Sequence, residues 1–308
     1  MYIAEDQIRA LLKYEALIPA IREALVDYSA GRVEQPPRTI LRAGNDEGAR
    51  NGWFAVMPVI HDDAMGVKAV TFFPGNAERG LPTHMAVIAL LSRCSGQPLA
   101  VMDGRLITEM RTAAVSAVAF NALAPAGVAS LGILGAGVQA RSHLRALRLV
   151  CPGLNDIRIW SRTRAHAERL AAEARAAGGA VVRATEIEDA ASAQVVLTVT
   201  ASPEPVLKGR WLRSDALILA VGAVGASLRE LDDEAVHGSW IVAESRAAVE
   251  REAGDIVLSG ARVQAEIGEI LARPGAFSIP RGRPVLFKSV GMAIEDLVAA
   301  RLVWQAMQ

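Results

Sequence analysis

The sequence predicts an α/β protein in which a doubly wound sheet of the Rossmann type is joined to a sheet-rich α+β domain. Two observations lead to this prediction. From residue 128 onward, apolar runs with strand character alternate with segments of helical periodicity, as in parallel sheets covered on both faces. Before about residue 105, short strand-like runs follow one another, separated by Gly, Pro, Asn and Asp. A chain of 308 residues has enough material for two ordinary domains.

The first domain is expected to cover residues 1–112. Apolar side chains at helical spacing within residues 5–30 predict an opening helix or helix pair, which ends before Gln35-Pro36-Pro37. Strands are then expected at residues 38–42, 53–60, 66–74, 84–92 and 98–104, followed by a helix at 107–123. A closing helix over 293–307, within residues 290–308, lies well past the last strand and is expected to rejoin this domain.

The second domain is expected to cover residues 113–289. Its predicted order is strand 128–134, helix 138–150, strand 156–160, helix 164–177 and strand 180–183. The runs "VVLTVT" and "ALILAVG" continue the pattern as buried parallel strands. This alternation is typical of a doubly wound sheet.

Composition and charge exclude several classes of protein. Hydrophobic residues make up 52% and charged residues 21%, which argues against disorder. The 33 basic and 33 acidic residues give a formal net charge of zero, so no global field would attract nucleic acid or an anionic membrane. Neither is therefore expected as a partner, and recognition of an anion must be local.

The cysteines and the apolar runs indicate a cytoplasmic protein. Cys94 and Cys151 have no spacing typical of a metal site, which predicts two free thiols in a reducing compartment and no metal. The N-terminus lacks the basic and apolar regions of a signal peptide. The longest apolar stretch, 216–226, is too short to span a bilayer.

The turn that joins the first strand and first helix of the second domain carries a candidate nucleotide site. It reads Gly135-Ala136-Gly137-Val138-Gln139-Ala140, with a strand before it and a helix after it. Gly135 permits a tight turn, Gly137 lets the backbone approach a pyrophosphate, and Ala140 is an accepted variant of the third glycine. Free N–H groups at the helix N-terminus would bind the phosphates.

The end of the next strand favours NADP(H) over NAD(H). NAD-type sites usually place an Asp or Glu there to bind the ribose 2′-hydroxyl, whereas this chain has Ser161, Arg162 and Thr163. A guanidinium and two hydroxyls would hold a 2′-phosphate by charge-assisted hydrogen bonds, and a carboxylate would repel it. The alternative is a solvated turn with arginines present by chance.

Three basic residues of the first domain lie in apolar surroundings. Lys68 is inside a strand, Arg38 is at a strand start, and Arg111 is on a helix of small apolar residues. Buried cations need partners, and each of these alone would more often form a structural ion pair. Three of them beside a nucleotide-binding fold indicate an anion site, most simply for a substrate carboxylate.

Eight motifs, in order from residue 66 to 300, resemble the ornithine cyclodeaminase/mu-crystallin family. They are "GVKAVTFFP", "PLAVMDGRLITEMRTAAVSAVA", "GILGAGVQA", "IWSRT", "ELDDE", "GDIVLSGA", "AEIGE" and "FKSVGMAIEDLVAA". The resemblance implies a homodimer whose first domain binds the substrate and forms the dimer, with a Rossmann domain for the cofactor. Members of the family include ornithine cyclodeaminases, alanine dehydrogenases, and ketimine or pyrroline-2-carboxylate reductases.

The resemblance also implies roles for individual residues. Arg38, Lys68 and Arg111 match positions that hold the substrate carboxylate, with Lys68 and Arg111 as catalytic residues. Glu266 resembles a ligand-pocket residue, although a helix-surface or ion-pair role is an equal alternative. The positions that match cofactor contacts are Thr83, His84, Arg111, Gly135, Ala136, Gly137, Val138, Gln139, Ser161, Arg162, Thr163, Thr200, Val221 and Ser289.

One departure from the family pattern selects among its activities. Cyclodeaminases of the family have an Asp shortly after the "VG" that ends a strand, whereas residues 221–229 contain no carboxylate here. Glu230 and Asp232 could replace that Asp only if the loop were rearranged, and are expected to be surface caps instead. The mu-crystallin-like branch also commonly has an Asp in this loop. The leading hypothesis is an NADPH-preferring reductase of cyclic ketimino acids. The alternatives are an ornithine cyclodeaminase, an alanine dehydrogenase and a non-catalytic NADPH-binding protein.

Overall fold

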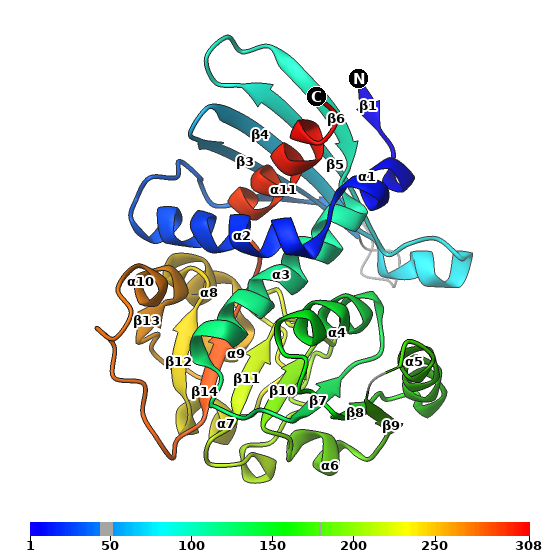
Figure 1. Cartoon of the computed structure of the whole chain (residues 1–308), viewed down its shortest axis with the longest axis vertical. Coiled ribbons are helices and arrows are strands. Elements are labelled where there is room, and N and C mark those ends of the chain that lie inside the picture. The colour runs from blue at the N-terminus through cyan, green and yellow to red at the C-terminus, as the bar shows by residue number, and fades with distance from the viewer. Residues whose placement is uncertain (44–51, 179) are drawn as a thin grey trace. The chain divides into compact units, whose positions relative to one another are not determined.

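The computed structural model describes residues 1–43, 52–178 and 180–308, and divides the chain into two compact units (Figure 1). The first unit consists of Met1–Thr112 and Met292–Gln308, and the second of Ala113–Gly291. The mixed α/β class expected from the sequence is confirmed. None of the helices in the described ranges is long and apolar enough to cross a membrane.

The first unit is built on a six-stranded sheet with the order β1-β6-β5-β4-β3-β2. Its neighbouring strands are antiparallel except for the parallel pair β1 and β6. The strands are β1 (Tyr2–Ile3), β2 (Thr39–Ala43), β3 (Gly52–His61), β4 (Ala64–Phe72), β5 (His84–Ser92) and β6 (Pro98–Asp103). The sequence predicted all of these except the two-residue β1.

Helices cover one face of this sheet. The predicted opening pair is present as α1 (Glu5–Leu11) and α2 (Tyr14–Ser29), and α2 buries Leu17, Ile21 and Leu25 at helical spacing. The closing helix α11 (Ala293–Gln305) packs against α2 and against β3, β4 and β5. Gly66 of β4 allows this close packing, because a Cβ there would lie 2.8 Å from Leu297 Cδ1. The short helix η1 (Pro74–Arg79) and α3 (Arg105–Leu123) complete the described elements that begin in this unit.

The alternation of side chains along β4 separates a covered face from an open one. Lys68 pairs with Met57 on β3 and Ile88 on β5, and these three buried residues share the covered face. The opposite face carries apolar side chains that remain exposed, among them Met85, Val87 and Val101.

The second unit contains an eight-stranded parallel sheet with the order β13-β12-β14-β11-β10-β7-β8-β9. Its strands are β7 (Ser130–Leu134), β8 (Asp156–Trp160), β9 (Val181–Ala184), β10 (Val195–Thr198), β11 (Leu217–Ala220), β12 (Trp240–Ala243), β13 (Ala265–Glu266) and β14 (Val285–Lys288). Both faces are covered, so β10, β11 and β14 are buried at every position. The sequence analysis did not predict β12, β13 or β14.

The helices of the second unit follow its strands in sequence. They are α4 (Val138–Val150), α5 (Arg164–Ala176), α6 (Ile187–Ala191), η2 (Gly209–Trp211), α7 (Asp233–Gly238), α8 (Arg246–Glu252), α9 (Gly254–Val257) and α10 (Ile267–Ala272). α4 and α5 were predicted from their periodicity. The others are seven residues or shorter, too short for a period of 3.6 to stand out.

Candidate functional site

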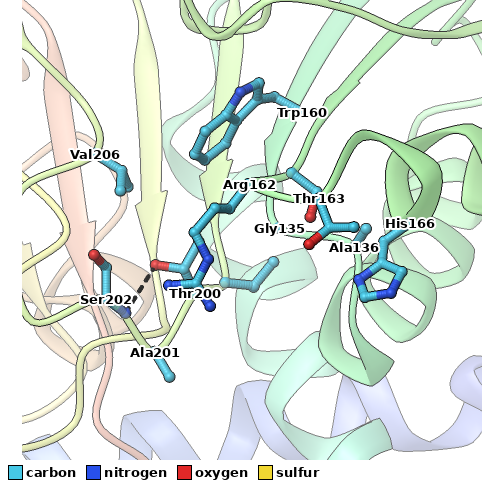
Figure 2. Close-up of a pocket in the computed structure, with 12 residues that line it drawn as sticks. Gly135, Ala136, Trp160, Arg162, Thr163, His166, Thr200, Ala201, Ser202 and Val206 are labelled. Carbon is cyan, nitrogen blue, oxygen red and sulfur yellow. Dashed lines mark hydrogen bonds between the residues drawn. The ribbon is translucent and has the colours of Figure 1, made fainter.

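A pocket of about 280 Å³ lies at the carboxyl ends of β7, β8 and β10 (Figure 2). The chain order of the strands reverses between β7 and β10, and open α/β sheets bind ligands beyond the strand ends at such a point. The residues that line it are Gly135, Ala136, Trp160, Ser161, Arg162, Thr163, His166, Val199, Thr200, Ala201, Ser202 and Val206.

The two glycines of the turn after β7 serve different purposes. Gly135 has φ +123°, and a Cβ there would lie 2.8 Å from the carbonyl oxygen of Val199, so this glycine is required by the protein's own backbone. Gly137 has φ −84°, and a Cβ there would meet no protein atom within 4 Å. The space beside Gly137 is therefore open to a ligand that approaches the backbone.

The N-terminus of α4 faces this turn without a side-chain cap. Gly137 is the N-cap residue, and among the described residues no side chain accepts a hydrogen bond from the first turn as a cap. A helix of 13 residues whose first N–H groups are uncapped favours an anion. This arrangement fits the diphosphate of a dinucleotide.

A buried histidine supports the first turn of α4. His143 Nδ1 lies 2.8 Å from the carbonyl oxygen of Gln139, and its Nε2 lies 2.9 Å from Ser116 Oγ. Desolvation lowers the pKa of His143 to about 4, against the opposite effect of the Gln139 carbonyl. The neutral ring donates to Gln139 through Nδ1 and accepts from Ser116 through Nε2, which ties α4 to α3.

The charge around the pocket is positive. Of the described residues that line it, none is an Asp or Glu. Arg164 is paired with Glu168 at 3.0 Å and with Glu186 at 2.9 Å, whereas no side chain in the described ranges pairs with the exposed Arg162. A guanidinium without a counter-charge beside two hydroxyl residues suits a phosphate group.

The structure brings together most of the predicted cofactor residues of this unit. Gly135, Ala136, Ser161, Arg162, Thr163 and Thr200 line the pocket. Gly137, Val138 and Gln139 continue the same turn into α4. Val221 and Ser289 follow β11 and β14, where their N–H groups bond to the carbonyls of Thr198 and Ala220.

Sequence reasoning missed the remaining lining residues. Trp160 and His166 flank the predicted Ser161–Thr163 segment, and Val199, Ala201, Ser202 and Val206 come from the segment after β10. The signal that could have found the second group is positional, because the end of the strand beside β7 at the reversal of strand order belongs to the pocket. Strand order could not be read from the chain before the fold was known.

Glu230 corrects one expectation. Its side chain is not a surface cap, because Glu230 is fully buried and accepts hydrogen bonds from Thr198, Thr200, Gly222 and Ala223. The segment returns into the core there, since Glu230 also donates its backbone N–H to Asp255. Asp232 is a cap as expected, accepting from the backbone N–H of Ala235 at the start of α7.

In the first unit, two of the predicted basic residues form one buried ion-pair cluster. Lys68 Nζ lies 2.6 Å from Asp296 Oδ2, Arg111 Nε 3.1 Å from Asp296 Oδ1, and Arg111 Nη1 2.6 Å from Glu295 Oε2. All four side chains are buried. The closing helix α11 therefore supplies the counter-charges for β4 and α3, a partnership that the sequence analysis did not identify.

Arg38 adds positive charge to this cluster. It precedes Thr39, whose partner is Val56, and so stands next to the Met57 and Lys68 pair on the sheet. The pKa of Lys68 is lowered to about 8, because burial and the charges of Arg111 and Arg38 together outweigh the opposite effect of Asp296. An amine with this pKa can hold or release a proton near neutral pH.

His84, which follows Thr83, is affected by the charge of the same cluster. His84 opens β5 and contacts Phe72, with ring centroids 4.4 Å apart. Loss of hydration around the ring, followed by the charge of Lys68, lowers the pKa of His84 to about 4. The residue keeps an exposed edge, but both causes act in the same direction, which leaves the ring neutral near pH 7. Thr83 Oγ1 lies 3.5 Å from His84 Nδ1.

Glu266 has a structural partner. Its Oε1 accepts from the backbone N–H of Arg246 at 2.8 Å, at the start of α8, and its own N–H donates to Glu269. Glu266 is not among the residues that line the pocket.

The doubly wound sheet and its pocket define the class of protein. This is a Rossmann-type protein, and its pocket lies at the strand ends where dinucleotides bind in such folds. The chain belongs to the ornithine cyclodeaminase/mu-crystallin family, whose model matches residues 1–308. The resemblance seen in the sequence motifs is thereby confirmed.

Three relatives illustrate the similarity. Ketimine reductase mu-crystallin of Rattus norvegicus is 40% identical over 311 residues, covering 99% of this chain and 96% of the relative. The structure of Thermococcus litoralis Δ1-pyrroline-2-carboxylate reductase in complex with NADH and L-proline matches with a TM-score of 0.93 and 33% identity, covering 99% and 97% of the two chains. An archaeal alanine dehydrogenase dimer with bound NAD matches with a TM-score of 0.91 and 29% identity, covering 99% and 95%.

Proposed function

We propose that this protein is an NAD(P)H-dependent reductase of cyclic ketimino acids, such as Δ1-pyrroline-2-carboxylate and Δ1-piperideine-2-carboxylate, which it converts to cyclic amino acids such as L-proline. The observation that carries the proposal is the match over nearly the whole chain to a reductase whose structure holds NADH and L-proline. The rat relative, a ketimine reductase by name, supports the same reaction class.

NADP(H) is the preferred cofactor in this proposal. Arg162, which pairs with no side chain in the described ranges, would hold the 2′-phosphate together with Ser161 and Thr163. None of the described lining residues is an Asp or Glu that would repel this phosphate. Gly135 to Gln139 and the N-terminus of α4 would hold the diphosphate, with Ala136 and Val138 on either side of the open Gly137. Thr83, His84, Arg111, Thr200, Val221 and Ser289 would contact the rest of the cofactor.

The buried cluster of the first unit supports binding of a substrate carboxylate. Lys68 and Arg111 are balanced by Asp296 and Glu295, and the half-buried Arg38 adds a further cation beside them. Arg38 and Arg111 would orient the carboxylate so that the imine carbon is presented at reacting distance. The Glu266 carboxylate holds the backbone N–H of Arg246 and does not line the described pocket, so its part in substrate binding would be indirect, through the segment at the start of α8.

Lys68 would provide the proton in this mechanism. When bound, the reduced nicotinamide supplies the hydride that the imine carbon accepts. The nitrogen of the cyclic imine gains its proton from Lys68 Nζ. The pKa of about 8 leaves the Lys68 amine mostly protonated near neutral pH. Asp296 stabilises the protonated amine and holds it in place through the 2.6 Å contact. A protonated imine is already electron-poor, so the reaction needs no further acid.

The loop after β11 argues against ornithine cyclisation. Residues 221–229 contain no carboxylate, and Glu230 and Asp232 are both committed to hydrogen bonds within the protein. Residues 221–229 therefore offer no carboxylate that could act on the ornithine amine.

A dimer formed through the open face of the first sheet is part of the proposal. Met85, Val87 and Val101 are 41%, 44% and 38% exposed, and they share that face with Val67 and Ala89. Exposed apolar patches of this kind mark protein interfaces. The alanine dehydrogenase relative, which is a dimer, supports this assignment.

NADPH consumption with Δ1-pyrroline-2-carboxylate tests the function. We expect L-proline to form without added ammonia. Release of ammonia from ornithine without a reductant would instead identify a cyclodeaminase. NADPH oxidation that requires both pyruvate and free ammonia would identify an alanine dehydrogenase. NADPH binding without turnover of any cyclic imine would identify a binding protein.

A further inference from the structure

Glu230 joins the ends of two neighbouring strands from inside the second unit. Its Oε1 accepts from Thr200 N at 2.5 Å and Thr200 Oγ1 at 2.7 Å. Its Oε2 accepts from Thr198 Oγ1 at 2.7 Å, Gly222 N at 2.8 Å and Ala223 N at 3.2 Å. Thr198 is the last residue of β10 and Thr200 follows that strand, whereas Gly222 and Ala223 follow β11. Five donors thus converge on one fully buried carboxylate.

A second buried ion pair supports this carboxylate. Asp255 Oδ1 accepts from Glu230 N at 2.8 Å and from Leu231 N, and Asp255 Oδ2 lies 3.0 Å from Lys288 Nζ. Lys288 also donates to the carbonyl of Ala223 at 3.2 Å, so the Ala223 residue is held at both its N–H and its C=O. Burial raises the pKa of Glu230, and the charge of Lys288 and the threonine hydrogen bonds oppose that rise. Five donors and a nearby cation suit the ionised form.

Gly222 shows how closely these groups are packed. A Cβ at Gly222 would lie 2.1 Å from Thr200 O and 2.5 Å from both Thr200 N and Glu230 Oε1. The carboxylate therefore approaches the backbone at a position that only glycine allows. The loop after β11 and the pocket residue Thr200 are thus held together by the same carboxylate.

This arrangement sets the hydrogen-bonding direction of Thr200. Its only hydroxyl proton is donated to Glu230, and its oxygen accepts from Ser202 N at 3.3 Å, the bond drawn in Figure 2. The remaining capacity of the oxygen is that of an acceptor. A phosphate oxygen cannot bond to it, whereas a ribose hydroxyl can donate to it.

We propose that Glu230 is a positioning residue that makes Thr200 a hydrogen-bond acceptor for a ribose hydroxyl of the dinucleotide. The inference rests on the nucleotide binding in the proposed function, but not on the imine as substrate. Glu230 acts through Thr200 and touches no cofactor itself.

Direct binding of NADPH, followed by fluorescence, tests the inference. We expect Thr200→Val and Glu230→Gln each to raise the Kd about tenfold, because each removes the oriented acceptor. The double variant should be no weaker than the weaker single variant, since both changes remove the same interaction. Thr200→Ser, which keeps the hydroxyl, should bind like the wild type. Additive losses in the double variant would overturn the inference.

A second variant covers the case in which Glu230→Gln does not fold. Thr198 donates to the same carboxylate but does not line the pocket, so Thr198→Val should still raise the Kd about threefold or more. Ser239→Ala is the matched control, because it removes another buried hydroxyl bond, to Ala235 O at 2.7 Å, far along the chain from β10. If Thr198→Val, Ser239→Ala and the wild type have equal Kd values for NADPH, Glu230 contributes to stability only.

The binding measurement separates this inference from the proposed reaction. A wild type that binds NADPH but reduces no cyclic imine overturns the proposed reaction, and the variants still decide the role of Glu230. A wild type that binds neither NADPH nor NADH overturns both.

Discussion

Lys68 Nζ lies 2.6 Å from Asp296 Oδ2, and the two side chains, each 2% exposed, come from β4 and from the last helix of the chain. Asp296 also receives Arg111 Nε at 3.1 Å. One carboxylate of α11 thus partners both residues that the family resemblance marks as catalytic. The position of the proposed proton donor and the anchoring of the closing helix therefore depend on the same contact.

The pH dependence of reduction should report on Lys68. Because the amine must be protonated to donate, we expect kcat/KM for Δ1-pyrroline-2-carboxylate to fall as pH rises through about 8. Lys68→Arg keeps the positive charge but does not release a proton in this range, so the variant should be slower by about a hundredfold or more. Its own pH profile reports the titration of the substrate imine and serves as the reference. A wild-type profile with the same shape as that of the variant would exclude Lys68 as the donor.

The stability of the first unit should depend on Asp296. Asp296→Asn removes the buried counter-charge that Lys68 and Arg111 share. We expect this loss to lower the free energy of unfolding by about 3–5 kcal/mol. Urea unfolding followed by circular dichroism measures this. Asp215→Asn is the control, because its ion pair with Arg213 is exposed and should contribute less than about 1 kcal/mol. A similar loss in the free energy of unfolding of both variants would mean that the buried cluster stabilises the protein no more than an exposed ion pair does.

Cofactor preference should depend on Arg162 and not on its neighbour Arg164. Arg162→Gln removes the charge that we assign to the 2′-phosphate, so the Kd for NADPH should rise about 10- to 100-fold while the Kd for NADH stays unchanged. Arg164→Gln is the matched control, since its guanidinium is already paired with Glu168 and Glu186. If both coenzymes lose affinity equally in Arg162→Gln, the residue binds a group that they share.

Periodicity and turn chemistry predicted the elements that are long or strongly patterned. The helices α2, α4 and α5 and the strands β3 to β6 lie where the apolar pattern places them, within a few residues. The strands β12, β13 and β14 were not predicted because their apolar runs are shorter than "VVLTVT" and "ALILAVG" and lack alternation that could mark them. The closing helix was expected to rejoin the first domain, but the strands that α11 covers lie far from it in the chain, and no local pattern encodes which strands these are.

The candidate site divides in the same way. The glycine turn and Arg162 were predictable because a local sequence motif specifies their conformation and charge. The burial of Glu230 was not, because "ELDDE" is acidic and resembles a solvated surface. Only the convergence of Thr198, Thr200 and Gly222 from two other segments makes a buried carboxylate stable there.

The oligomeric state should respond to the open face of the first sheet. Val87→Glu places a charge in the centre of that apolar face, and we expect the molar mass from light scattering to fall from that of a dimer to that of a monomer. Val181→Glu is the control, because Val181 is also exposed, at 64%, but belongs to β9 in the second unit. A dimer that persists in Val87→Glu and dissociates in Val181→Glu would move the interface to the second unit.

The two glycines of the nucleotide turn should give opposite results when each is replaced by alanine. Gly135→Ala forces a side chain into a φ of +123° and against the carbonyl of Val199 at 2.8 Å, so the variant should lose thermal stability. Gly137→Ala has an ordinary φ of −84° and open space around its Cβ, so it should keep its melting temperature.

NADPH affinity completes the comparison. Because the added methyl group of Gly137→Ala would occupy the path by which a diphosphate approaches the backbone, its Kd for NADPH should rise about tenfold or more in a fully folded protein. The apo melting temperature and the Kd, measured on the same samples, separate the two effects. A Gly137→Ala protein that binds NADPH as tightly as the wild type would show that the phosphates do not lie against this turn, whatever the fate of Gly135→Ala.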